Sequence, residues 1–357
     1  MRIVGKILLF FLAVLFALAA GEGIVRAFDL GPEVGRIQLG MVRLTPDPAL
    51  RYELIPNYVS PLRDVVINAH GMRNRPVEPA KAPGVFRIAC IGDSIAFGMG
   101  TPRDTFSVQL EALLNADGGG VRTFEALNFG VPGYHIGQVA AMLAERVPDF
   151  DSDLVLYLYC LNDPQETSRE LEGTLRQRAV APARQAYVRR LWAVSESARG
   201  GSRLWLLARL AAASGFRRNE AEPREGFRDD MQILLDGGGP AYYRSRYRAG
   251  PALDRFHAGL DAIARWSRDS GVPVLVITVP LFTGFEPYAL EDIHGQVREA
   301  AETRGLPVLD LLPDYRAASG GFHADLLHPN REGYGLAARA VAAELQRRGW
   351  LAGAGRK

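Results

Sequence analysis

The chain has 357 residues, of which 48% are hydrophobic and 23% are charged, and its formal net charge at pH 7 is +2. These values are ordinary for a globular protein, and the length allows one large domain or two smaller ones. The net charge alone argues neither for a nucleic-acid partner nor against one, and we predict none. The two cysteines, Cys90 and Cys160, lie in apolar runs and are too few for a disulfide framework. We interpret them as small buried hydrophobic residues. A disulfide between them is the alternative if their two strands are neighbours.

The first predicted element is an apolar segment at the N-terminus. Arg2 and Lys6 precede the uninterrupted apolar run Ile7–Ala20, and small residues follow it. Basic residues before a short apolar run predict an export signal. The run is shorter than the roughly 20 residues of a membrane-spanning helix, but its apolar neighbours extend it. Residues 1–26 are therefore either a cleaved signal peptide or a retained signal anchor. In both cases we expect export, with the protein anchored in the inner membrane facing the periplasm, or free in the periplasm or secreted.

The next segment, residues 27–83, is an N-terminal extension rich in Pro and Arg. It lacks sustained periodicity, and Val65–Ile67 predicts a strand lying on the main domain. From residue 84 to residue 348, apolar runs alternate with helical patterns. Such alternation predicts an α/β fold with a parallel sheet covered on both faces by helices. The predicted strands are Phe86–Ile91, Thr123–Leu127, Leu154–Cys160, Val274–Val279 and Val308–Leu311.

Residues 164–250 interrupt the alternation between the third and fourth predicted strands. The segment is too long for one crossover, is rich in Arg, and contains a helical stretch at Leu204–Gly215. We interpret it as a helical insertion over the functional face of the domain, acting as a lid or a partner surface. A role at the membrane surface is an alternative. Residues 349–357 form a tail.

Reactive side chains follow the ends of several predicted strands. Ligands of an open parallel sheet bind beyond the carboxyl ends of the strands. Side chains that are far apart in the sequence should therefore meet at one edge of the sheet. The candidate residues are Ser94, Gly133, Asn162, Asp325 and His328.

Their residue types fit the hydrolysis of a carboxylic ester through an acyl-serine. A serine hydroxyl becomes a good nucleophile when a neighbouring base, here His328, takes its proton. Asp325, three residues earlier, would fix the histidine tautomer and stabilise the imidazolium. The oxyanion of the tetrahedral intermediate needs preplaced donors. The backbone N–H groups of Ser94 and Gly133 and the side-chain amide of Asn162 could supply them.

These blocks resemble those of the SGNH hydrolases, also called the GDSL esterase/lipase family, over residues 84–348. The four lettered residues of the family correspond to Ser94, Gly133, Asn162 and His328, and Asp325 completes the triad. One departure is Cys160, where the family usually has Gly. The resemblance, which extends to exported bacterial members with an N-terminal anchor, implies a three-layer flavodoxin-like sandwich. Its five-stranded parallel sheet would have the order 2-1-3-4-5. The resemblance also implies hydrolysis of short acyl esters of carbohydrates or lipids without a metal or other cofactor.

The sequence thus predicts an exported serine esterase acting on a small-molecule, polysaccharide or lipid ester. A cell-envelope acyltransferase using the same triad is one alternative, and a non-catalytic envelope binding or scaffold protein is another. The intact set of Ser94, Asp325 and His328 argues against a pure binding protein, which has no need of all three.

Other polar residues near these motifs have simpler interpretations. Asp93 fits a turn former, and His135 fits a surface loop histidine. Tyr134 fits either an acyl pocket or a packed aromatic residue. His323 competes with His328 as the base but lacks an aspartate three residues before it. No metal site is predicted, because the remaining histidines have no suitably spaced partners: His70, His257 and His294.

Overall fold

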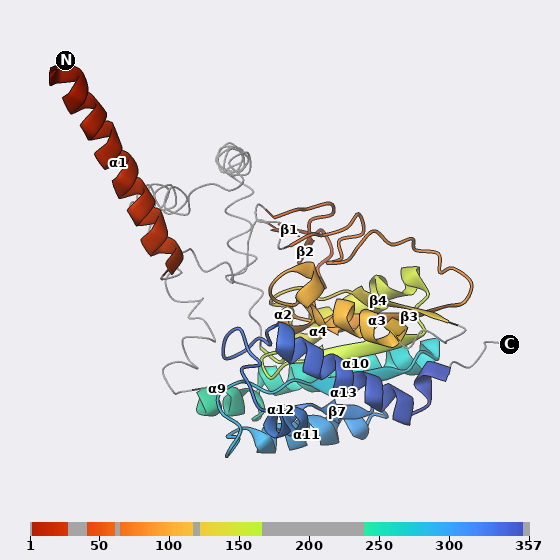
Figure 1. Cartoon of the computed structure of the whole chain (residues 1–357). Helices are drawn as coiled ribbons and strands as arrows, with labels where there is room; N and C mark the ends of the chain where they lie inside the picture. The colour runs from red at the N-terminus through yellow and green to blue at the C-terminus, as the bar shows by residue number, and fades with distance from the viewer. Residues whose placement is uncertain (1, 28–40, 61–64, 117–121, 166–238, 353–357) are drawn as a thin grey trace. The chain divides into compact units, whose positions relative to one another are not determined.

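The computed structural model describes residues 2–27, 41–60, 65–116, 122–165 and 239–352 (Figure 1). The chain divides into two units, residues 1–37 with 181–226, and residues 38–180 with 227–357. In the first unit the described element is helix α1 (Arg2–Ala27), which contains the apolar run of the N-terminus. Across the described residues, no helix is both long enough and apolar enough to cross a membrane.

The second unit is built on a five-stranded parallel sheet in the order β4-β3-β5-β6-β7. Numbered along the chain, these strands have the order 2-1-3-4-5, which confirms the predicted topology. Every residue of β5 and β6 is buried, as apolar strands covered on both faces require. The strands are β3 (Val85–Gly92), β4 (Thr123–Asn128), β5 (Leu154–Tyr159), β6 (Val274–Thr278) and β7 (Val308–Asp310).

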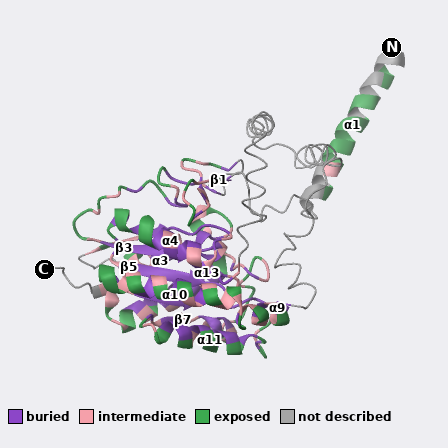
Figure 2. Ribbon diagram, turned by 180° about the vertical axis from the view of Figure 1, so that it is seen from behind, coloured by how far each residue is buried: buried purple, intermediate pink, exposed green. Residues whose placement is uncertain are grey.

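Helices cover both faces of this sheet (Figure 1). Helix α3 packs against α13, whereas α10 packs against both α4 and α11. The buried residues concentrate in the strands and on the helix sides that face them (Figure 2). The helices are α2 (Ser94–Phe97), α3 (Phe106–Ala116), α4 (Ile136–Glu145), α9 (Gly239–Arg246), α10 (Pro251–Ser270), α11 (Glu291–Glu302), α12 (Leu312–Ala317) and α13 (Arg331–Arg347).

The N-terminal extension differs from the prediction. Its two strands are β1 (Val42–Leu44) and β2 (Tyr52–Leu54), which pair with each other in antiparallel fashion. The predicted strand Val65–Ile67 is wrong, because the segment makes only an isolated bridge between Val66 and Val59. The N–H of Val65 donates to the Ser60 side chain at 2.9 Å, so this donor is not available to a strand ladder.

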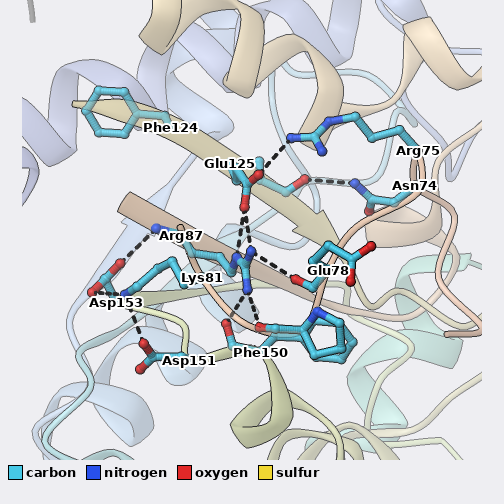
Figure 3. A network of polar contacts seen from close by, with 12 residues as sticks. Asn74, Arg75, Glu78, Lys81, Arg87, Phe124, Glu125, Phe150, Asp151 and Asp153 are labelled. Carbon is cyan, nitrogen blue, oxygen red and sulfur yellow. Dashed lines mark hydrogen bonds and ion pairs between the residues drawn. The ribbon is translucent and has the colours of Figure 1, made fainter. Parts of the chain in front are cut away.

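The extension is bound to the α/β domain near the amino ends of β3 and β4 (Figure 3). Arg87 lies opposite Glu125 in the sheet register and forms an ion pair with it at 2.7 Å. Although Arg87 is only 2% exposed, its remaining donors bind the carbonyl oxygens of Glu78, Pro79 and Phe150. A buried guanidinium is tolerated only with partners of this kind.

The remaining predictions concern the insertion and the cysteines. Residues 166–238, including the predicted helix at 204–215, lie outside the described residues. The described end of the insertion forms helix α9. Cys90 and Cys160 are buried and are not joined in a disulfide, although they lie on or next to the neighbouring strands β3 and β5. Burial raises the pKa of the Cys90 thiol, which fits a buried hydrophobic role.

Candidate active site

The candidate nucleophile lies on the tight turn between β3 and α2. Gly92 has a φ of +146°, and a Cβ there would lie 2.7 Å from the carbonyl oxygen of Leu158. Glycine is therefore required for the strand to turn so closely to β5. The next residue, Asp93, caps helix α2 by accepting a hydrogen bond from the Ile95 N–H at 2.8 Å. Asp93 is thus a turn former, as predicted, and Ser94 follows it as the first residue of α2.

The structure brings Ser94, His328 and Asp325 together in one chain of hydrogen bonds. His328 Nε2 lies 2.9 Å from Ser94 Oγ, and His328 Nδ1 lies 2.8 Å from Asp325 Oδ2. The side chains of Asp325 and His328 belong to one short loop. Asp325 Oδ1 accepts hydrogen bonds from the backbone N–H groups of Leu327 and His328, at 2.8 and 2.7 Å. These bonds fold the loop back on its own carboxylate and fix the distance between aspartate and histidine.

The pKa of Asp325 is lowered from its ordinary value. Burial acts to raise the pKa of this carboxyl, but the hydrogen bond and the charge of His328 and the two loop amides outweigh it. The carboxylate therefore remains ionised and accepts a hydrogen bond from the N–H group at Nδ1 of the histidine. Nε2 of His328 is then the atom that can accept the hydroxyl proton of Ser94.

A second loop, which follows β4, lies beside the nucleophile turn. Asn128 accepts a hydrogen bond from the Gly130 N–H at 2.9 Å and donates one to the Phe97 carbonyl at 3.1 Å. A Cβ on Gly130 would lie 2.1 Å from the Phe97 nitrogen, so only glycine fits this crossing. Further along the same loop, Gly133 has a φ of +78°, in the left-handed region that favours glycine.

Asn162 lies next to Asp93, the residue before the candidate nucleophile. Burial raises the pKa of the Asp93 carboxyl, while the Ile95 amide, the charge of His328 and a hydrogen bond with the Asn162 side chain act against this rise. Asn162 Oδ1 is buried and has no hydrogen-bond partner among the described residues. The neighbouring Asp163 is buried as well and accepts a hydrogen bond from Tyr157. A buried polar layer thus lies beneath the turn of Ser94.

Several other sequence candidates have structural roles. His135 is not a plain loop residue but caps helix α4, since its Nδ1 accepts from the Gly137 N–H at 3.0 Å. Tyr134 is a packed aromatic residue that is 3% exposed. His323 is exposed and stacks on Phe282 with a centroid distance of 5.4 Å, whereas the histidine beside Ser94 is His328.

The interpretation of His294 needs a correction. The sequence spacing indicated no partner, yet His294 is buried and its Nδ1 lies 2.8 Å from Asp310 Oδ1. Its Nε2 lies 3.3 Å from the hydroxyl of Tyr288, which accepts the Leu281 N–H at 2.9 Å. Helix α11 and strand β7 bring these residues together, which sequence spacing does not reveal. Within the described ranges, no group of three or more His, Cys, Asp or Glu residues could hold a metal ion.

Sequence reasoning missed three residues of the extension that contact the loops of the site. The Arg73 guanidinium donates to the carbonyl oxygens of Phe97, the last residue of α2, and of Gly98 and Gly100. The Asn74 side chain binds the edge of β4, accepting from Asn128 N and donating to Ala126 O. The Tyr52 hydroxyl donates to the Pro132 carbonyl at 2.9 Å. Because the extension has no periodicity, no sequence signal identified these residues.

The chain is similar to one known family and to several solved structures. The sequence model of the GDSL-like lipase/acylhydrolase family matches residues 90–336, a range that contains all five candidate residues. A solved lipase/acylhydrolase from Enterococcus faecalis is 16% identical, with 74% of this chain and 96% of that chain covered and a TM-score of 0.42. The acetyl xylan esterase AlAXEase is 12% identical, with 73% and 100% covered and a TM-score of 0.41. A two-domain esterase active on acetylated mannans is 13% identical, with 74% and 49% covered and a TM-score of 0.41. No curated protein shows significant similarity.

Proposed function

Because the chain belongs to the GDSL-like lipase/acylhydrolase family and is therefore an ester-bond hydrolase, we propose that it is a serine esterase. The observation that carries this proposal is the hydrogen-bonded row of Ser94, His328 and Asp325 at the carboxyl edge of the sheet. Its geometry matches what general-base activation of a serine hydroxyl requires.

In the first half of the reaction, Ser94 Oγ attacks the carbonyl carbon of the ester while its proton moves to His328 Nε2. The resulting oxyanion accepts hydrogen bonds from the backbone N–H groups of Ser94 and Gly133 and from the Asn162 amide. When the intermediate collapses, the bond to the alcohol oxygen breaks and His328 protonates the departing alcohol. Asp325 stabilises the imidazolium throughout.

In the second half, water enters the acyl-serine site. His328 removes a proton from the water as its oxygen attacks the acyl carbon. Collapse of the second tetrahedral intermediate releases the carboxylic acid and returns the proton to Ser94 Oγ. The cycle needs no reactant besides the ester and water.

We propose a short acyl group on a carbohydrate or lipid alcohol as the substrate class. A hollow of about 110 Å³ lies between the loop after α2 and the loop of His328. It is lined by Met99, Gly100, Asp104, Ala324, Asn330 and Arg331. Hydrolysis of nitrophenyl esters of increasing chain length tests this class, with turnover expected to be highest for the shortest acyl groups. Product analysis with added acceptor alcohols separates hydrolysis from acyl transfer.

A fluorophosphonate probe, which phosphonylates activated serines, tests the nucleophile. We expect the wild-type protein to be labelled once and Ser94→Ala not to be labelled. Ser270→Ala, which changes a serine at the end of α10, is the matched control and should be labelled like wild type. An unlabelled folded wild-type protein, or equal labelling of Ser94→Ala, would refute the proposal.

We also propose that the protein is exported through its N-terminal segment. Arg2 and Lys6 before the apolar run Ile7–Ala20 support this proposal. Cell fractionation of the producing bacterium should find the esterase outside the cytoplasm. The mass of the mature chain distinguishes a cleaved signal peptide from a retained N-terminus. Recovery of the active protein only in the cytoplasm would contradict export.

A further inference from the structure

We propose that Tyr52, in the N-terminal extension, is a positioning residue that fixes the direction of the Gly133 N–H in the oxyanion hole. This inference rests on the proposed esterase function, because it concerns a donor that acts on the reacting oxyanion. The extension would then form part of the catalytic machinery as well as a covering of the domain.

The hydrogen bond of Tyr52 acts on the peptide unit that contains this donor. The Tyr52 hydroxyl donates to the carbonyl oxygen of Pro132 at 2.9 Å. That carbonyl and the Gly133 N–H belong to one peptide group, which is planar and trans, so the two bonds point in opposite directions. Fixing the Pro132 oxygen therefore fixes the Gly133 hydrogen. A hydrogen bond to the carbonyl also polarises the N–H and makes it a stronger donor.

Two types of turn could connect the same ends here, and they differ in the direction of the central peptide group. Residues 131–134 form a turn in which the Tyr134 N–H donates to the Val131 carbonyl at 3.2 Å. Proline at the second position and glycine with a φ of +78° at the third are the features of a type II turn. A type I turn has the same ends, but its central peptide is turned over. The bond from Tyr52 stabilises the type II arrangement and disfavours that flip.

The Tyr52 side chain is itself held in place by several contacts. Its side chain is fully buried, and its ring meets that of Tyr134 edge to face at a centroid distance of 5.1 Å. The Tyr134 hydroxyl donates back to the Tyr52 carbonyl, so the two tyrosines bind each other's segments reciprocally. Gln138 in α4 adds a bond of 2.7 Å to the Leu50 carbonyl. Burial raises the pKa of the Tyr52 phenol well above its ordinary value, which keeps the hydroxyl protonated as a donor.

The test removes the hydroxyl and leaves the ring. We expect Tyr52→Phe to lower kcat about 10- to 100-fold, less than or equal to the loss of a whole oxyanion donor, with KM changed by less than about twofold. Tyr134→Phe, which removes only the return bond, should lower kcat less. Tyr315→Phe is the matched control, since Tyr315 is also buried and also donates to a carbonyl, that of Gly333, at 2.9 Å. It should lose stability while kcat stays within about twofold of wild type.

Equal kcat values for Tyr52→Phe and Tyr315→Phe, measured below the unfolding midpoint of each variant, would overturn the proposal. A second measurement does not depend on activity. In glycine-labelled protein, the Gly133 amide should change its NMR chemical shift and exchange faster in Tyr52→Phe than in Tyr315→Phe. An unchanged Gly133 amide refutes the positioning role even in an active enzyme. A changed amide in a protein without esterase activity would refute the proposed function alone.

Discussion

At the scale of single residues, two histidines near the C-terminus have different partners. His328 bridges Ser94 and Asp325, whereas His323 is exposed and stacks on Phe282. We expect His328→Ala to lower kcat/KM by about four orders of magnitude, because the serine loses its base. His323→Ala should change it by less than about threefold. Steady-state kinetics with a nitrophenyl ester measures both, and comparable losses would refute the assignment of the base.

Asp163 predicts a pH dependence of stability. Burial raises the pKa of its carboxyl well above the ordinary value, and the Asp93 carboxylate raises it further. Its Oδ1 atom has no hydrogen-bond partner among the described residues. The folded protein therefore binds a proton at Asp163 more tightly than the unfolded chain does. The ionised Asp163 carboxylate destabilises the folded protein. This destabilisation is absent below the pKa of the unfolded state, about 3.9, and grows as the pH rises toward the pKa of the folded state.

Asp163→Asn removes that destabilisation and keeps an acceptor for the Tyr157 hydroxyl. We expect the free energy of unfolding to rise by more than about 1 kcal/mol at pH 8, with a smaller gain at pH 5 and none near pH 4. Urea denaturation at the three pH values measures the change. Asp269→Asn, at an exposed site on α10, is the control and should show no such trend. A gain independent of pH would contradict the assignment to Asp163.

At the scale of elements, the crossing of the Asn128–Gly133 loop over helix α2 depends on glycine. A Cβ on Gly130 would lie 2.1 Å from the Phe97 nitrogen, and its other nearest neighbours are also backbone atoms of α2. We expect Gly130→Ala to destabilise the protein by about 3 kcal/mol through overpacking. The matched control is Gly295→Ala within α11, where a Cβ would meet nothing within 4 Å. That change should stabilise the helix by about 0.5–1 kcal/mol. Equal effects of the two substitutions on the urea midpoint would contradict this account.

Some of the elements could be predicted from the sequence, whereas others could not. The strands around Leu154 and Val274 were predictable because burial on both faces makes their sequences continuously apolar. The reactive residues could be placed because each follows a strand end. The hairpin around Tyr52 could not be predicted, since its two three-residue strands are too short for periodicity. Likewise, the pairing of His294 with Asp310 depends on how α11 packs on β7 and leaves no fixed spacing.

At the scale of the whole molecule, the buried guanidinium of Arg87 binds both the extension and the sheet (Figure 3). We expect Arg87→Met to cost about 3 kcal/mol or more, because it leaves Glu125 and three carbonyl groups without their buried partner. Arg43→Met is the matched control. Arg43 forms an equally short ion pair with Glu53, but its side chain is 53% exposed, so the loss should stay below about 1 kcal/mol. Urea denaturation measures both, and similar losses would contradict the importance of burial.

The separation of the nucleophile from its base along the chain has a consequence for when activity can begin. Ser94 and His328 are 234 residues apart, and helix α13 closes the distance through the Tyr334 hydroxyl, which donates to the Ile95 carbonyl at 3.1 Å. Gln109 in α3 adds a bond of 2.9 Å to the Arg331 carbonyl. A growing chain that has reached only the central strands thus carries a serine without a base. We therefore expect esterase activity to begin only after residue 334 has been synthesised and α13 has docked.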